Sequence, residues 1–187
     1  MLVLPVAAAT TIVLVRPHYP ENVGAAARAM KTMGLERLVL VRPGRLAVPE
    51  HEMALKMAVK SRDVLAAARE VATVEEALAG ATLAVATTSR RGVPYVLSPR
   101  SLALRAVDEA RRGGRIAVVF GNEKTGLAEK DLARCGARLR IPMADDQPSI
   151  NLAQAVQIVA YELFVAGLCA RGEGEAAVES PTPSEAR

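Results

Sequence analysis

Short apolar runs alternate with amphipathic stretches along most of the chain. The runs that predict strands are "TIVLVRP" (11–17), "RLVLVRP" (37–43), "TLAVATT" (82–88), "RIAVVFG" (115–121) and "ARLRIP" (137–142). Between them the spacing of apolar residues predicts helices over 20–34, 51–59, 61–70, 99–112, 128–135 and 151–170. Apolar strands that alternate with helices indicate a parallel sheet covered on both faces. The sequence therefore predicts an α/β fold with a single parallel-sheet domain.

Boundary residues support several of these helices. Gly34 follows the first helix in the position that glycine often takes after a helix end. Ser61 is a possible cap for the helix over 61–70. "TVEE" at 73–76 has the capping-box spacing and predicts one more short helix, which Gly80 closes.

The two ends of the chain differ from the rest. The start, "MLVLPVAAA", is apolar but has no basic region and contains Pro5, so we expect a disordered lead into the first strand rather than a signal peptide. The last residues, "GEGEAAVESPTPSEAR", combine Gly, Pro, Ser and Glu without hydrophobic periodicity. We therefore expect an ordered domain over 1–171 and a disordered acidic tail over 172–187.

The helix over 151–170 is the most hydrophobic part of the chain. Its apolar stretch, 152–170, approaches the roughly 20 residues that a membrane span requires. It also contains Gln154, Gln157 and Glu162, and a charge at the centre of a bilayer is costly. We interpret it as a buried helix of a soluble protein and expect no membrane association. Because its apolar residues occupy nearly every face, it needs partners on all sides, including a second subunit.

The charge is unevenly distributed. The chain has 24 basic and 20 acidic residues, a net charge of +4. Residues 172–187 hold four Glu and one Arg, so residues 1–171 hold 23 basic and 16 acidic residues, a net of +7. Such a basic body is compatible with a phosphate-bearing partner, although a solvated basic surface explains the charge equally well. With no Trp and only five Phe and Tyr, the chain does not resemble a base-stacking platform.

Several standard functional sites are missing from the sequence. Cys135 and Cys169 match no metal-binding spacing, and we expect both to be small buried hydrophobic residues in a reducing cytoplasm. With only two histidines, His18 and His51, a histidine metal site is improbable, so no metal is expected. The chain also lacks GxGxxG, GxxxxGK[ST] and GxSxG, which argues against the usual dehydrogenase, kinase and hydrolase classes.

The ends of the predicted strands are the places to look for chemistry. Ligands of parallel α/β sheets collect beyond the carboxyl ends of the strands. Four segments leave strand ends here, "RPHYPENVG", "TTSRRGVP", "FGNEKTGL" and "IPMADDQPSINLA". The tetrapeptide "LVRP" ends both of the first two strands, at 14–17 and 40–43, which is too short to indicate an internal repeat. It does show both strands ending at a proline, which cannot donate to a ladder.

Two of these loops have unusual composition. In "FGNEKTGL", Gly121 and Gly126 allow positive φ and close approach of the backbone to a ligand; the alternative is an ordinary loop with exposed charges. In "QPSINLAQAV", Ser149 and Asn151 precede the most hydrophobic helix, and the alternative is that one of them is only its N-cap.

Taken together, three segments resemble a known family. "NVGAAARAMKTMG", "VFGNEKTGL" and "SINLAQAVQIVAYE" are similar to the three motifs of the TrmH-type branch of the SPOUT RNA methyltransferases. The stretch "AAARAMKTMGLERLVLVRP" resembles the TrmJ-like members, which methylate a ribose in tRNA. The resemblance covers residues 11–168. It implies a C-terminal trefoil knot, S-adenosylmethionine bound in the knot, and a homodimer whose active site uses both subunits.

The resemblance also assigns residues to the site. Catalytic roles fall on Asn22 and Arg28 in the first motif, Glu123 in the second, and Ser149 and Asn151 in the third. The cofactor is expected at Thr87, Thr88, Ser89, Gly121, Asn122, Gly126, Ile141, Met143, Ser149 and Leu152. Arg90 and Arg91 are candidate phosphate contacts, and a solvated basic pair is an equally good interpretation.

The implied reaction transfers a methyl group to a ribose 2′-hydroxyl, so the enzyme must align the reactants and stabilise a developing alkoxide. A guanidinium stays protonated in proteins, so we expect Arg28 to clamp a phosphate and offset this charge rather than act as a base. The alternative for Arg28 is a surface arginine in a row with Lys31. Glu123 would order Asn22 and its loop or contact RNA, and Ser149 and Asn151 would hold the ribose or the cofactor loop.

The implied substrate is tRNA, most simply the first nucleotide of its anticodon loop, in the cytoplasm. TrmJ-like proteins often carry a further C-terminal region that contributes to tRNA binding, whereas only the acidic tail follows the last helix here. Three alternatives therefore stay open: 2′-O-methylation of rRNA, a non-catalytic knotted RNA-binding module, and methylation of a small molecule.

Overall fold

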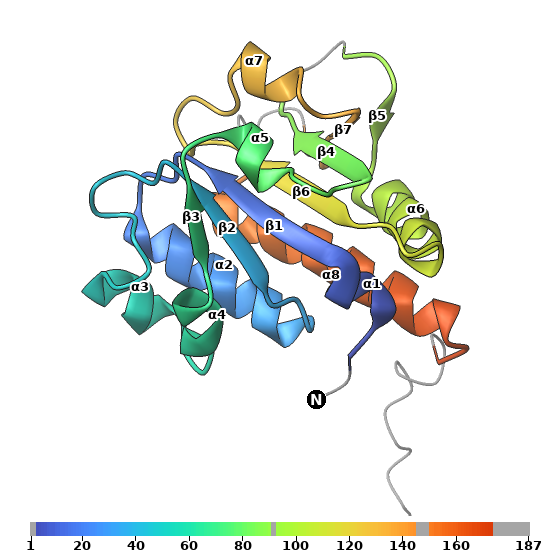
Figure 1. The fold of residues 1–187 in the computed structure, drawn as a ribbon, viewed down its shortest axis with the longest axis horizontal. Coiled ribbons are helices and arrows are strands. Elements are labelled where there is room, and N and C mark those ends of the chain that lie inside the picture. Colours follow the sequence, from blue (N-terminus) through green and yellow to red (C-terminus); the bar gives the residue numbers. More distant parts are fainter. Residues whose placement is uncertain (1–2, 91–92, 145–149, 174–187) are drawn as a thin grey trace, which may run out of the picture.

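The computed structural model describes residues 3–90, 93–144 and 150–173 and has one parallel sheet at its centre (Figure 1). Within these residues the sheet has seven strands in the order β3-β2-β1-β6-β4-β7-β5. The strands are β1 (Thr10–Val15), β2 (Arg37–Val41), β3 (Arg69–Val71), β4 (Leu83–Thr87), β5 (Val96–Leu97), β6 (Ile116–Phe120) and β7 (Ala137–Leu139). All of their pairings are parallel. The predicted α/β fold with a single parallel sheet is confirmed.

Helices cover both faces of the sheet, as predicted. They are α1 (Pro5–Ala9), α2 (Pro20–Thr32), α3 (Glu52–Met57), α4 (Arg62–Ala66), α5 (Val74–Ala77), α6 (Pro99–Arg111), α7 (Glu129–Leu132) and α8 (Leu152–Ala170). The long helices α2, α6 and α8 pack on one face, over a cluster that includes Ile12 and Leu14 of β1. The short helices α5 and α7 pack on the other face, over a cluster that includes Val13 and Val15. Figure 1 shows α8 behind the strands and α5 in front of them.

Helix α2 is built from small residues because its neighbours are close. Pro20 occupies its first turn, where the missing N–H costs nothing. At Gly24 a Cβ atom would lie 2.1 Å from the carbonyl oxygen of Ala54 in α3, so only glycine permits this approach. Gly34 adopts φ 73° just after the helix, as predicted for a glycine that ends it.

The start of the chain differs from its prediction. Residues 5–9 were expected to be part of a disordered lead, but they form α1. Pro5 sits in its first turn, and Leu4 and Val6 are buried against Gly167 of α8. A Cβ at Gly167 would come within 2.8 Å of Leu4, so the glycine makes room for this segment. Burial against α8, which the local sequence does not reveal, orders the start.

The region predicted as one helix over 61–70 is also different. It contains the short helix α4 and then β3, which pairs with β2 at the sheet edge. Ser61 is the N-cap residue of α4 but makes no capping bond, because its hydroxyl donates to the carbonyl of Val59. β5, which pairs with β7, was not predicted either. By contrast, the capping box at Thr73 and Glu76 is present, with Thr73 Oγ1 accepting from the Glu76 N–H at 3.2 Å.

Helix α8 has the length and composition of a membrane span, with 19 residues and a mean hydropathy of 1.6. In the structure it packs against α2 and α6 as a core helix, as predicted. Cys169, near its end, is exposed, so its expected burial is wrong, whereas Cys135 is partly buried. Burial raises the pKa of the Cys135 thiol to about 11. Most of the predicted acidic tail, 174–187, lies outside the described residues.

Candidate active site

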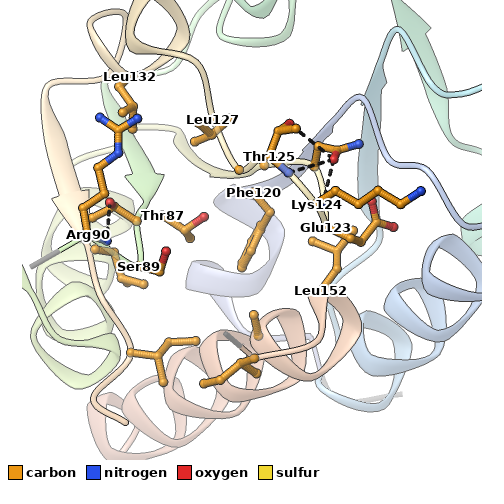
Figure 2. Close-up of a pocket in the computed structure, with 18 of the residues that line it drawn as sticks. Thr87, Ser89, Arg90, Phe120, Glu123, Lys124, Thr125, Leu127, Leu132 and Leu152 are labelled. Carbon is orange, nitrogen blue, oxygen red and sulfur yellow. Dashed lines mark hydrogen bonds between the residues drawn. The ribbon is translucent and has the colours of Figure 1, made fainter. Parts of the chain in front are cut away.

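A cavity of about 290 Å³ opens at the carboxyl ends of β4, β6 and β7. In Figure 2, Thr87 and Ser89 face it from one side and Glu123 and Leu152 from the other, with Phe120 between them. The residues predicted to bind the cofactor meet here: Thr87, Thr88, Ser89, Gly121, Asn122, Gly126, Ile141, Met143 and Leu152 all line the cavity. Ser149, predicted for both cofactor binding and catalysis, lies outside the described residues, as does Arg91.

The loop over 121–126 forms one wall and is held by its own hydrogen bonds. Asn122 and Gly126 form an antiparallel bridge, and Gly126 adopts φ 67°. The Asn122 side-chain oxygen accepts from the N–H groups of Lys124 and Thr125 at 2.9 and 3.1 Å. A Cβ at Gly121 would lie 2.4 Å from the backbone carbon of Gly126. Glycine is therefore required where the two arms of the loop approach each other.

The interior of the cavity is mainly uncharged. Besides the predicted residues, its lining includes the apolar side chains of Phe120, Leu127, Leu132, Leu139, Ile150 and Ala155. The charged lining residues are Arg90, Glu123 and Lys124. Arg90 forms an ion pair with Glu129 of α7, so its charge is already partnered. Apolar walls with a few polar groups and backbone amides suit a flat organic ligand better than a bare anion.

A chain of polar contacts joins the three sequence motifs beside this cavity. The Glu123 carboxylate accepts from the backbone N–H groups of His18 at 2.8 Å and Tyr19 at 3.3 Å. It also accepts from Asn22 Nδ2 at 2.8 Å. The other end of the Asn22 amide, Oδ1, accepts from Asn151 Nδ2 at 2.9 Å. Asn22 is itself buried, so these bonds satisfy a side chain that water cannot reach easily.

Asn151 has two structural tasks. Its side-chain oxygen accepts from the N–H groups of Ala153 and Gln154, at 2.9 and 3.3 Å, which makes it the N-cap of α8. The same side chain donates to Asn22 at the start of α2. The alternative that Asn151 is an N-cap is therefore confirmed. The same side chain also joins the first motif to the third.

Arg28 lies apart from this network. It is on the exposed face of α2 and does not line the cavity. Within the described residues its side chain makes no ion pair or hydrogen bond, whereas Lys31 pairs with Asp63 of α4 and with Glu36. The hydrogen bond between Lys31 and Asp63 raises the pKa of the lysine and lowers that of the carboxyl group. Of the five predicted catalytic residues, all but Ser149 lie within the described residues. Asn22, Glu123 and Asn151 are joined by hydrogen bonds, and Arg28 is not.

Some residues of this site were not predicted. His18 and Tyr19 contribute backbone N–H groups to Glu123, and Lys124 Nζ lies 2.9 Å from His18 Nε2. The segment "RPHYPENVG" was singled out because it leaves a strand end, but backbone donors have no signature in the side chains. Within the part of the chain that the structure describes, no three His, Cys, Asp or Glu residues gather into a group that could hold a metal ion.

Known proteins share both the sequence and the fold. Residues 9–161 match the model of the SpoU rRNA Methylase family. A tRNA (cytidine/uridine/adenosine-2′-O-)-methyltransferase TrmJ from Pseudomonas aeruginosa is 42% identical over 164 residues, which are 87% of this chain and 63% of that protein. The tRNA (cytidine/uridine-2′-O-)-methyltransferase TrmJ of Salmonella typhimurium is 42% identical over 174 residues, 92% of this chain and 70% of that protein.

A solved structure of a probable methyltransferase from Bordetella pertussis superposes with a TM-score of 0.83 at 36% identity, over 87% of this chain and 98% of that one. The chain thus spans just under two thirds of the Pseudomonas protein and nearly all of the Bordetella chain. The matched region contains the cavity and the contacts between Glu123, Asn22 and Asn151. The chain therefore belongs to the SpoU methylase family.

Proposed function

We propose that this protein is an S-adenosylmethionine-dependent RNA methyltransferase that transfers a methyl group to a ribose 2′-hydroxyl, with tRNA as its substrate class. The observation that carries the proposal is the convergence of three sequence motifs at one sheet edge, joined through Glu123, Asn22 and Asn151 beside a single cavity. The names of the TrmJ relatives from Pseudomonas and Salmonella support the reaction and the substrate class.

The cavity fits the proposed cofactor in size and chemistry. Its volume is close to the lower end of the range for small-molecule sites, about 300 Å³. Thr87, Thr88 and Ser89 on one side and Gly121, Asn122 and Gly126 on the other offer hydroxyls and backbone groups, while Ile141, Met143 and Leu152 offer apolar contact. We assign Ser149 to the same site through the resemblance. When bound, S-adenosylmethionine supplies a methyl group that its sulfonium already activates.

The remaining task falls to the side chains of the protein. A 2′-hydroxyl becomes a good nucleophile only as its proton leaves, so the site must hold the ribose in line and stabilise the charge on its oxygen. We assign this electrostatic role to Arg28, which stays protonated. Glu123 and Asn22 act as positioning residues, since they fix the loop over 17–22 and the start of α2 against α8.

The proposed enzyme works as a homodimer, because Arg28 does not reach the cavity of its own chain. Helix α8 keeps an apolar stripe, Ile158, Tyr161 and Val165, that its own chain covers only in part. Tyr161 is 52% exposed. We propose that a second copy packs on this stripe and on the outer face of α2, and that its Arg28 completes the site. We also propose, from the family resemblance, that the C-terminal part of the fold contains a trefoil knot.

Transfer of labelled methyl groups tests the function directly. The protein is incubated with labelled S-adenosylmethionine and unmodified tRNA or rRNA from a strain without 2′-O-methylation, and the labelled nucleotide is mapped. We expect one ribose of tRNA, in the anticodon loop, to be labelled. The second candidate function is 2′-O-methylation of rRNA, which the description of the matched family favours. Labelling of rRNA instead of tRNA would support it. No labelling of either RNA, together with no heat of S-adenosylmethionine binding in calorimetry, would overturn both and favour a non-catalytic RNA-binding module. Cofactor binding without labelling of either RNA would favour methylation of a small molecule.

A further inference from the structure

A second cavity, of about 280 Å³, lies at the carboxyl ends of β1, β2 and β3. It is on the face of the sheet that α5 and α7 cover, since Val15, Val41 and Val74 line it. Its other lining residues include four cations and two carboxylates: Arg16, Arg42, Lys130, Arg134, Glu75 and Asp131. None of these residues belongs to the three motifs, and the proposed methyl transfer does not use them.

The two "LVRP" segments explain how two of these cations reach the same place. Register pairs Val15 with Val41, so Arg16 and Arg42 follow equivalent positions of neighbouring strands. Each ladder continues one step further, with Arg16 N–H donating to Val41 at 2.7 Å and Arg42 N–H donating to Val71 at 3.1 Å. Both arginines adopt left-handed backbone, φ 52° and 46°, which is uncommon for residues other than glycine. Because the same backbone conformation recurs at the ends of two adjacent strands, the side chains of Arg16 and Arg42 leave the sheet on the same side.

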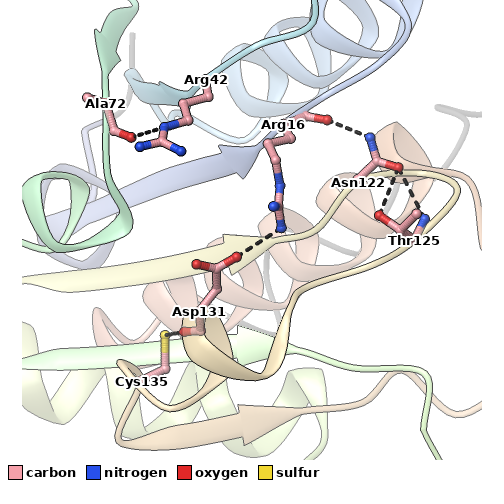
Figure 3. Close-up of polar contacts among 7 residues, drawn as sticks. All are labelled: Arg16, Arg42, Ala72, Asn122, Thr125, Asp131 and Cys135. Atoms are coloured by element: carbon pink, nitrogen blue, oxygen red, sulfur yellow. Dashed lines mark hydrogen bonds and ion pairs between the residues drawn. The ribbon is translucent and has the colours of Figure 1, made fainter.

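Two of the four cations are neutralised inside the cavity. Arg16 pairs with Asp131 at 2.9 Å, and that carboxylate side chain is only 12% exposed (Figure 3). Arg134 pairs with Glu75 at 2.6 Å. Arg42 donates from Nε to the carbonyl of Ala72 at 2.6 Å, which fixes the guanidinium but leaves its charge. Among the described residues no carboxylate is paired with Arg42 or with Lys130. The cavity therefore keeps a surplus of two positive charges.

We propose that this second cavity binds a backbone phosphate of the RNA whose ribose is methylated by the cofactor in the first cavity. The proposal rests on the proposed function. The two cavities share a wall, because Asn122 of the first donates from Nδ2 to the carbonyl of Arg16 in the second at 2.6 Å (Figure 3). An RNA strand that lies along the carboxyl edge of the sheet would pass over both cavities. Arg42 and Lys130 meet the phosphate, and the paired Arg16 and Arg134 hold the walls in place.

Charge removal tests the site without touching either ion pair. The double variant R42Q/K130Q is compared with R105Q/R112Q, which removes two exposed charges, one from α6 and one from its C-cap residue. Neither of these control arginines lines the second cavity or forms an ion pair among the described residues. We expect R42Q/K130Q to weaken binding of substrate RNA about tenfold at moderate salt. Its plot of log K against log salt should be less steep, by about 0.7–0.9 for each lost phosphate contact. The affinity for S-adenosylmethionine, measured by calorimetry, should match that of the wild type.

The two possible sources of a phosphate are separated by a second titration. The wild type and both variants are titrated with inorganic phosphate, and phosphate is tested as a competitor of RNA. If inorganic phosphate competes weakly with RNA for the wild type, and this competition is lost in R42Q/K130Q, the cavity binds a phosphate of the RNA backbone. Equal RNA affinity and equal salt dependence in the two double variants would overturn the proposal, whether or not free phosphate binds. Failure of the proposed function looks different, since the wild type itself would then methylate no RNA.

Discussion

The two cavities along the carboxyl edge of the sheet are lined by different kinds of residue. The first uses glycines, hydroxyls, backbone amides and aliphatic side chains, and its shape depends on a loop held by its own hydrogen bonds. The second uses charged side chains of α5, of α7 and of the residues that follow β1, β2 and α7, and two ion pairs fix four of these side chains. The first cavity is therefore suited to a ligand that fits its shape, and the second to a ligand of negative charge.

This contrast has a physical consequence. Interactions that depend on fit and apolar burial change little with ionic strength, whereas phosphate contacts weaken as salt rises. Binding of the cofactor and binding of RNA should therefore respond to different substitutions and different conditions. We expect the largest effects from variants in or beside the first cavity and the smallest effect from a variant that lies away from both.

The largest effect is expected from Gly121→Val. The new side chain has no room, since a Cβ alone would lie 2.4 Å from Gly126 and 2.5 Å from the nitrogen of Leu127. The loop must open, so we expect no measurable heat of S-adenosylmethionine binding in calorimetry. The salt dependence of RNA binding should survive, because Arg42 and Lys130 of the second cavity lie outside this loop.

Gly136→Val is the matched control for that variant, since nothing lies within 4 Å of a Cβ at Gly136. It should bind the cofactor like the wild type. Equal cofactor affinity in the two variants would show that the first cavity does not depend on the close approach of the loop arms.

A second large effect is expected for Arg28→Ala, which lies outside both cavities. Loss of a group that stabilises transition-state charge costs about 10²–10³-fold in rate. We expect kcat for methyl transfer to fall by that factor while cofactor affinity stays within about twofold. Parallel loss of rate and of cofactor affinity would make Arg28 a structural residue instead. Arg105→Ala, also an exposed helix arginine, serves as the control.

Glu123→Ala acts on the connection between the motifs and should have an intermediate effect. It leaves Asn22 Nδ2 and the N–H groups of His18 and Tyr19 without their acceptor. Each lost bond to a charged group costs about 1.5–3 kcal/mol when no water replaces it, and less at this partly exposed position. We expect a Tm several degrees lower and weaker cofactor binding. The exposed Glu50→Ala should change neither quantity.

The smallest effect is expected away from both cavities, at the ion pair of Lys31 with Asp63. The pKa of Asp63 is lowered in the folded protein, chiefly by the hydrogen bond from Lys31. The pair therefore stabilises the fold above the ordinary pKa of 3.8, and this contribution is lost as pH falls through the lower folded value. Asp63→Asn should lower the Tm at pH 7 by at most about 2 °C. The difference between variant and wild type should vanish in acid.

Sequence patterns predicted the centre of the fold better than its edges. The apolar runs that became β1, β2, β4 and β6 are buried on both faces, so their composition alone indicates a parallel sheet. β3 and β5 have only three and two residues, and they are strands because a neighbouring strand pairs with them. A local pattern cannot report such a pairing. The same holds for α1, which burial against α8 orders.

The site shows a similar division. Side chains in recognisable motifs, such as Asn22, Glu123 and Asn151, could be singled out from the sequence. The backbone donors of His18 and Tyr19 could not, because every residue except proline carries the same N–H. The second cavity draws its charges from four elements that are far apart in the sequence, and the left-handed backbone that directs Arg16 and Arg42 has no side-chain signature.

The double use of Asn151 has a consequence for the timing of assembly during synthesis. A ribosome releases the residues of α2 and the loop over 121–126 well before it releases Asn151. Until that amide arrives, Asn22 lacks one of its two partners and the last core helix has no cap. A nascent chain can form most of the sheet while the candidate active site is still incomplete. The contacts of Asn22 are therefore completed late, when α8 packs onto the rest of the domain.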